Sequence, residues 1–160
     1  MKRITYLLAL NLFLAGLLYS CSSDDNDNVT GSIIGSWKPV KMTMVGTVSQ
    51  AGVSRPINQT VTVNECQQKS RTVFSADGTV ETTSWDDTSS TCQQISTESS
   101  SYIYDSNAAT LTMKQNGITL TSKILKLNDS ECVTEDNLSN FSLGGFIFTG
   151  KITTYNTKVN

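Results

Sequence analysis

Apolar and polar residues alternate with a period of two along most of the chain after its first thirty positions. Val40, Met42 and Met44 alternate with polar residues, and the same alternation recurs in residues 109–113 and 118–121. Such alternation is typical of strands with one buried face. Beyond the first twenty residues, no stretch has the sustained apolar spacing of an amphipathic helix. The pattern therefore predicts an all-β domain with no major helix.

Turn residues separate about eight to nine predicted strands. Asp77-Gly78 and Asn116-Gly117 each lie between two β-type segments and predict tight hairpins. The alternation changes phase within residues 123–125, which predicts a β-bulge. Three connections are expected to be loops: residues 46–56, 86–91 and 136–142. Because the strands follow one another without room for crossover helices, they predict an antiparallel meander that forms a single barrel.

The first twenty residues form a separate apolar segment. Two basic residues precede an apolar run, residues 4–18, which is short for a membrane span of about 20 residues. A basic start, an apolar run and a small residue before Cys21 predict a cleaved signal over residues 1–20. Leu18-Tyr19-Ser20-Cys21 resembles a bacterial lipobox, which implies that Cys21 carries lipid. The alternative is an ordinary secretory signal.

A polar segment follows Cys21. Residues 22–28 contain only Ser, Asp and Asn, so residues 21–32 are expected to form a disordered acidic tether. The segment also resembles the acidic signal that follows the lipidated cysteine in Bacteroidetes lipoproteins. That resemblance implies a protein anchored in the outer membrane and facing the cell exterior, whereas the alternative is a solvated spacer. Residues 33–160 would then be the folded domain.

Charge and residue types exclude several classes of function. Removal of Lys2 and Arg3 with the leader leaves ten of the twelve Lys and Arg against fourteen Asp and Glu, a formal charge of −4. No basic patch indicates a nucleic-acid partner. The chain has no histidine, so the usual activation of a serine or cysteine nucleophile is unavailable. We therefore expect a monomer that is not an enzyme and holds no cofactor and no metal.

Three cysteines remain if Cys21 carries lipid, and an exported protein meets an oxidising compartment. Cys66 and Cys92 flank the predicted hairpin of residues 73–85, which favours a disulfide between them. Cys132 would then be free and buried. The pairs Cys92–Cys132 and Cys66–Cys132 remain alternatives at this point.

Three features carry a resemblance to lipocalin-like lipoproteins of the Bacteroidetes. They are Gly35-Ser36-Trp37, the segment Thr72-Val73-Phe74-Ser75-Ala76-Asp77-Gly78-Thr79, and the layout of the strands from Leu111 to Val159. The resemblance covers Ile33 to the C-terminus and implies a lipocalin-like barrel. It also implies that Trp37 closes one end of the barrel beneath Lys158, held by a cation–π contact.

A small barrel can enclose one ligand, so the leading hypothesis is a binding protein for a small apolar or amphipathic molecule. The same apolar residues would fill a core that holds no ligand. Candidate lining residues are Met42, Met44, Phe74, Tyr102, Leu111, Met113, Leu120, Phe146 and Phe148.

Two other functions remain open. The barrel could be a non-catalytic scaffold whose loops contact a partner in a complex of the cell envelope. Alternatively, Trp85 with Asp86 and Asp87 could contact a glycan, because sugar sites combine an aromatic ring with carboxylates. A tryptophan at the end of a strand beside a solvated loop would explain the same residues.

Overall fold

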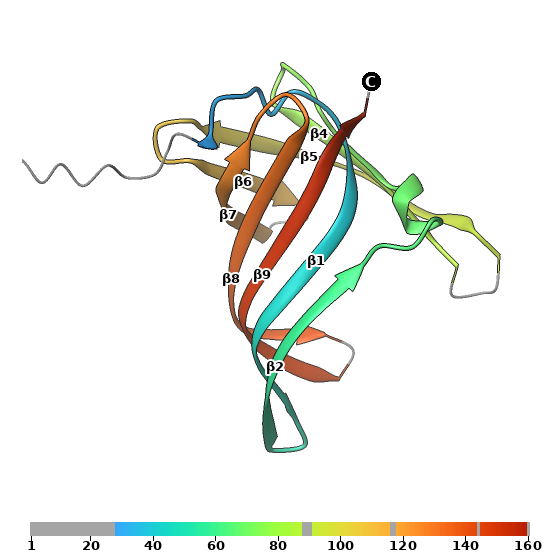
Figure 1. Ribbon diagram of the computed structural model, residues 1–160, viewed down its shortest axis with the longest axis vertical. Helices are drawn as coiled ribbons and strands as arrows, with labels where there is room; N and C mark the ends of the chain where they lie inside the picture. The colour runs from blue at the N-terminus through green and yellow to red at the C-terminus, as the bar shows by residue number, and fades with distance from the viewer. Residues whose placement is uncertain (1–27, 88–90, 116–117, 144, 160) are drawn as a thin grey trace, which may run out of the picture.

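The strands of the computed structural model, which describes residues 28–87, 91–115, 118–143 and 145–159, form one antiparallel sheet (Figure 1). The strand order is β2-β1-β3-β4-β5-β6-β7-β8-β9, and β1 also pairs with β9. Eight strands therefore close into a barrel, and β2 is added beside β1. This confirms the predicted all-β meander. The strands are β1 (Gly35–Gln50), β2 (Val53–Thr62), β3 (Arg71–Phe74), β4 (Thr79–Asp86), β5 (Gln93–Asp105), β6 (Thr110–Gln115), β7 (Ile118–Leu127), β8 (Glu131–Leu143) and β9 (Phe146–Val159).

Two of the predicted local features are confirmed. The Asp77-Gly78 turn joins β3 to β4, and Asp77 Oδ1 accepts hydrogen bonds from the amide and hydroxyl of Thr79. These bonds hold the pKa of the Asp77 carboxyl below its usual value. The register of β7 against β8 shifts between Ile124 and Lys126, so the bulge lies where the phase change predicts it. Asn116-Gly117 lies outside the described residues.

Two predicted loops are strands instead. Residues 46–56 form the ends of β1 and β2, joined at Ala51 and Gly52, and the pairs run from Lys41–Thr62 to Gln50–Val53. Residues 136–142 belong to β8, which pairs with β9 as far as Leu143 and Phe146. Both predictions were wrong because glycine and polar residues there indicate turns locally. Residues 46–49 pair with β9 as well as with β2, and residues 136–143 pair with β9 on both sides of a register shift after Leu138, so both segments are extended.

The sheet therefore has a closed part and an open part. We call the open part the flap: it comprises residues 44–50 of β1, 53–59 of β2, 138–143 of β8 and 146–150 of β9. Its strands lie in the order β2-β1-β9-β8, and it extends below the barrel in Figure 1. Cross-strand partners place their side chains on the same face. One face of the flap is thus continuous with the barrel interior.

Two facing glycines join the flap to the barrel. Gly46 of β1 pairs with Gly150 of β9. A Cβ on Gly46 would lie 2.3 Å from the carbonyl oxygen of Thr149, and one on Gly150 would lie 2.3 Å from that of Val45. The Phe148 ring approaches Gly150 on this face and is only 1% exposed. The glycines therefore allow a close approach of β1 and β9, and Phe148 fills the space that they leave.

The main core lies at the other end of the barrel. Trp37 is 1% exposed, and its indole Nε1 donates a 2.7 Å hydrogen bond to the carbonyl oxygen of Ile33. Burial of large side chains of this kind supplies most of the free energy that favours folding. The buried cluster comprises Ile33, Trp37, Phe74, Val80, Ala109, Leu111, Ile124, Leu127 and Cys132.

The chain enters the barrel earlier than the predicted boundary at residue 33. Val29 bridges Leu127, whose carbonyl oxygen accepts hydrogen bonds from the amides of Thr30 and Gly31. Residues 29–32 are therefore docked on the barrel rather than part of a free tether, because the apolar Val29 packs against the core. The predicted signal, Cys21 and the tether up to residue 27 lie outside the described residues.

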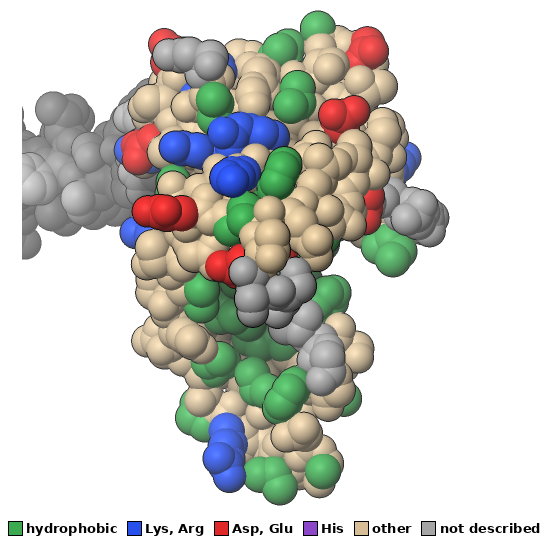
Figure 2. All heavy atoms as spheres, turned by 90° about the vertical axis from the view of Figure 1, so that its right-hand side faces the viewer, with side chains coloured by type: hydrophobic (Ala, Val, Ile, Leu, Met, Phe, Trp, Pro, Cys, Tyr) green, Lys and Arg blue, Asp and Glu red, His purple; other side chains and the backbone are tan. Residues whose placement is uncertain are grey.

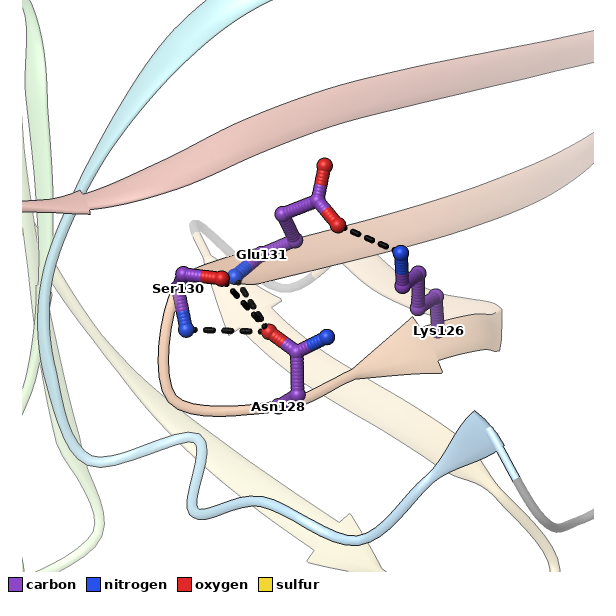
Figure 3. A network of polar contacts seen from close by, with 4 residues as sticks. All are labelled: Lys126, Asn128, Ser130 and Glu131. Atoms are coloured by element: carbon purple, nitrogen blue, oxygen red, sulfur yellow. Dashed lines mark hydrogen bonds and ion pairs between the residues drawn. The ribbon is translucent and has the colours of Figure 1, made fainter.

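The docked segment rests beside the turn between β7 and β8 (Figure 3). There, Asn128 Oδ1 accepts hydrogen bonds from the amides of Ser130 and Glu131 and from the Ser130 hydroxyl. Lys126 forms an ion pair with Glu131 across the same turn. A Cβ on Gly31 would lie 2.7 Å from Asn128 Cα, so the segment and the turn are in close contact. Among the described residues, no helix is long and apolar enough to cross a membrane.

Candidate functional site

The interior of the barrel contains a cavity of about 270 Å³. Alternate residues of each strand face inward, so the cavity takes its lining from seven strands: β1, β3, β4, β6, β7, β8 and β9. One part of the lining is apolar: Trp37, Phe74, Leu111, Met113 and Cys132. The other part is polar and includes Ser122, Thr134, Asp136, Thr154 and Asn156. The cavity is therefore amphipathic rather than apolar throughout.

A serine and a carboxylate organise the polar part. Ser122 of β7 is 3% exposed, and its hydroxyl donates a 2.5 Å hydrogen bond to Asp136 Oδ1 of β8. Within the described part of the chain, the other oxygen of Asp136 has no hydrogen-bond partner, and no lysine or arginine forms an ion pair with it. Asp136 can therefore accept a hydrogen bond from a molecule in the cavity.

Cys132 also lines the cavity and is a free, buried thiol. Burial raises the pKa of Cys132 to about 12. The thiolate is the nucleophilic form of cysteine, so this residue is unreactive at neutral pH. Its contribution is that of a small hydrophobic side chain.

The predicted disulfide between Cys66 and Cys92 is confirmed, with their Cα atoms 5.5 Å apart. The bridge joins the short 3-10 helix η2 (Gln67–Lys69) to the start of β5. Of the alternatives, the pairs with Cys132 are excluded because that thiol is free.

The residues near this bridge include the candidate glycan site. Lys69 Nζ lies 5.4 Å from the centre of the Trp85 ring. The Asp86 carboxylate accepts a hydrogen bond from Gln67, and the Asp87 carboxylate accepts one from Asn64. The ring and both acids thus have partners within the protein, an arrangement that favours a structural role for this loop.

At the closed end of the barrel, Lys158 Nζ lies 5.2 Å from the centre of the Trp37 ring. The two residues are register partners on β1 and β9. The expected cation–π arrangement is therefore present, and it covers the end of the barrel where the N-terminal segment docks.

The other sequence-predicted lining residues divide between the two parts of the sheet. Phe74, Leu111 and Met113 line the cavity. Tyr102 packs edge-on against Phe74 with ring centroids 4.9 Å apart, and its hydroxyl donates a hydrogen bond to the carbonyl oxygen of Ser75. Leu120 pairs with Met113 but is 38% exposed and does not line the cavity.

The remaining four predicted lining residues lie towards the flap or on it. Met42 pairs with Thr154, a cavity residue, and Met44 pairs with Ile152 on the same face. Phe148 covers the glycine pair. Phe146 lines a separate groove on the flap. The structure therefore does not bring all nine residues to one site.

The flap groove has a volume of about 500 Å³ and was not predicted from the sequence. In Figure 2, hydrophobic side chains gather over this lower part of the molecule. The signal that could have revealed it is the alternation of Val53, Arg55 and Ile57, which lies within the segment predicted as a loop. Its lining residues are Val48, Gln50, Val53, Arg55, Pro56, Ile57 and Phe146.

Comparison with known proteins gives one family match. The sequence model described as a lipocalin-like domain matches residues 33–133. No curated protein sequence matches the chain. Among solved structures, a deswapped triple mutant of bovine odorant binding protein is similar, with a TM-score of 0.39 and 15% sequence identity. The similarity covers 78% of this chain and 72% of that one.

Proposed function

Because the chain belongs to the lipocalin-like domain family, we propose that it is a non-catalytic binding protein that takes a small amphipathic ligand into its barrel. One observation carries this proposal: the amphipathic cavity beside the unpartnered oxygen of Asp136. Ligand pockets commonly measure about 300–1,000 Å³, so a cavity of about 270 Å³ lies just below that range and suits a small ligand.

The lining also indicates the chemistry of the ligand. Trp37, Phe74 and Leu111 offer apolar surface to a hydrocarbon or ring. Asp136 is the one charged residue in the lining, and a carboxylate without a cation partner favours a hydrogen-bond donor or a cationic group. A short amine with an apolar chain meets both requirements.

Displacement of a fluorescent probe tests this proposal. N-phenyl-1-naphthylamine, a neutral probe that brightens in apolar sites, should bind to the protein and be displaced by octylamine more readily than by octanoate. Met113→Trp should fill the cavity and weaken probe binding at least tenfold. Thr121→Trp is the matched control, because Thr121 pairs with Thr112 on the outer face of the same strands. Unchanged probe binding to Met113→Trp would overturn the proposal.

Substitution of the carboxylate tests the ligand chemistry separately. Asp136→Asn should remove the preference for octylamine over octanoate while leaving the neutral probe bound. If the preference persists in this variant, the amine is recognised elsewhere.

We also propose that Cys21 is lipidated and holds the domain at the outer membrane, facing the cell exterior. The lipobox-like segment and the acidic residues after Cys21 support this location. In addition, the N-terminal segment docks at the closed end of the barrel, so an anchor there would leave the flap directed away from the membrane (Figure 1). Metabolic labelling with an alkyne-tagged fatty acid should modify the wild type but not Cys21→Ser. Protease treatment of intact cells should digest the domain if it faces outward.

A further inference from the structure

The flap offers a second surface for a ligand, outside the barrel and independent of the cavity. Val48 of β1 pairs with Phe148 of β9 on one side and with Arg55 of β2 on the other, so these three residues form a row across one face. The neighbouring row on the same face consists of Ile57, Gly46 and Gly150, so its middle position has no side chain. Phe148 fills the space beside the glycine pair, and the groove lies over Val48, Gln50, Val53, Arg55, Pro56, Ile57 and Phe146.

Several apolar residues lie side by side in the groove. Val53 is 57% exposed and Phe146 is 41% exposed, and both line the same groove with Val48 and Ile57. Single exposed apolar residues are ordinary, but a contiguous apolar patch with a concave shape indicates binding. The volume of about 500 Å³ lies within the range of ligand pockets.

One cation lies in this groove, between Val53 and Ile57 on β2. Arg55 is the only charged residue in the flap as defined above. In the described part of the chain it has no ion pair and no hydrogen bond through its side chain. A guanidinium group matches the geometry of a carboxylate, to which it can donate two parallel hydrogen bonds. The groove therefore combines apolar walls with an unpaired positive charge.

From this combination we propose that the flap groove binds a free single-chain carboxylate amphiphile, with the alkyl chain along Val53, Ile57 and Phe146 and the carboxylate at Arg55. The charge at this site is opposite to that of the barrel cavity, where Asp136 favours a donor or a cation. The two sites therefore select different ligands.

Other occupants fit the groove less well. Recognition of an anionic membrane surface typically uses clusters of four to eight basic residues, whereas the flap has one. Addition of a strand from a second copy would use the free edge of β2. The amide of Val63 donates a hydrogen bond to the carbonyl oxygen of Val40, so the odd-numbered residues of β2 direct their backbone groups toward β1. The even-numbered residues direct theirs toward the free edge, where Pro56 has no N–H to donate. A proline at an edge opposes such pairing.

The test measures binding of laurate and of dodecyltrimethylammonium, which has the same chain length and the opposite charge, by titration calorimetry below their micelle concentrations. The wild type should bind laurate more tightly at the groove. Arg55→Gln should weaken laurate binding at least about tenfold, because the two charge-assisted hydrogen bonds of the guanidinium are lost. Arg55→Glu should reverse the preference in favour of the cation. Lys151→Gln is the matched control, because Lys151 pairs with Glu135 and lies outside the groove; it should bind laurate like the wild type.

Further variants locate the bound chain. Phe146→Ser should weaken both amphiphiles, whereas Met113→Trp, which fills the barrel cavity, should leave laurate binding unchanged. Loss of laurate binding in Met113→Trp alone would place laurate in the barrel and overturn this proposal without affecting the proposed function. Wild-type affinity for laurate in Arg55→Glu would also overturn it. Binding of the wild type to phosphatidylglycerol vesicles, without binding of free laurate, would likewise overturn the proposal.

Discussion

The barrel and the flap share strands β1, β8 and β9, yet only the barrel encloses a core. In the barrel, inward-facing residues meet side chains from strands on the opposite side, and nine of them form one buried cluster. In the flap, the same alternation continues along β1 and β9, but no strand among the described residues faces it. Apart from Phe148, the apolar flap residues whose burial the structure describes remain at least partly exposed. An alternating pattern thus defines an apolar face, and closure of the sheet decides whether that face becomes a core or a groove.

The two regions also differ in the charge placed on the shared face. The barrel cavity holds the carboxylate of Asp136, which is bonded to Ser122. The flap groove holds the guanidinium of Arg55, which has no partner in the described structure. One continuous face therefore has a hydrogen-bond acceptor at one end and a cation at the other. This difference is the physical basis for assigning different ligands to the two sites.

The largest expected difference between the regions concerns stability. Trp37→Ala should lower the free energy of unfolding by about 3–5 kcal/mol, because it leaves a cavity in the core and removes the hydrogen bond to Ile33. Phe146→Ala in the flap should cost less than about 1 kcal/mol, since Phe146 is already 41% exposed. Urea unfolding followed by circular dichroism measures both. Equal losses would show that the flap contributes to the core.

The sequence predicted the barrel better than the flap, for a physical reason. The Asp77-Gly78 turn, the bulge near residue 124 and the Cys66–Cys92 bridge all depend on residues close in sequence or on one hairpin. The flap depends on the pairing of Gly46 with Gly150, more than a hundred positions apart. Glycine indicates a turn locally, so the prediction replaced the end of β1 with a loop that begins at Gly46.

The candidate site divides in the same way. Phe74, Leu111 and Met113 were predicted because a large apolar residue on an alternating strand points inward. Asp136 and Arg55 were not, because each lay in a segment predicted as a loop. The alternation of Val53, Arg55 and Ile57 would place Arg55 on an apolar face only if the segment were assigned to a strand. Placing Asp136 beside the apolar residues of the cavity required the strand register. The apolar lining residues could therefore be predicted from the sequence, whereas the charged residues of each site were identified only from the structure.

A pH-dependent difference of intermediate size is expected from Cys132. Burial raises the pKa of this thiol from 9.0 to about 12. Below pH 9 the thiol is protonated in both states, so the free energy of unfolding does not depend on it. Between pH 9 and 12 the unfolded chain loses the proton and the folded chain keeps it, which lowers the free energy of unfolding by about 1.4 kcal/mol per pH unit.

Comparison of the wild type with Cys132→Val isolates this effect. At pH 10.5 the wild type should have lost about 2 kcal/mol more than the variant, relative to pH 8. Tyrosine and lysine titrate in both proteins, so their contributions cancel in the difference. Urea unfolding at the two pH values provides the measurement. Equal losses in the two proteins would mean that Cys132 is accessible to solvent and that the barrel opens more readily than its buried core indicates.

The smallest expected effect gives the sharpest contrast between the regions, because it compares one residue type in two places. Val53 in the flap groove is 57% exposed, and Val80 in the barrel core is 2% exposed. Val53→Ser should change the free energy of unfolding by less than about 0.5 kcal/mol, since an exposed side chain gains little from folding. Val80→Ser should cost about 2–3 kcal/mol, because it removes buried methyl groups and buries a hydroxyl. A large decrease in the free energy of unfolding for Val53→Ser would mean that the concave face is packed in solution, for example against a second copy. Sedimentation of the same variant would then show a mass different from that of the wild type. A small loss leaves the face open to a ligand, and the low cost of exposing Val53 and Phe146 is what allows a groove to persist beside a stable barrel.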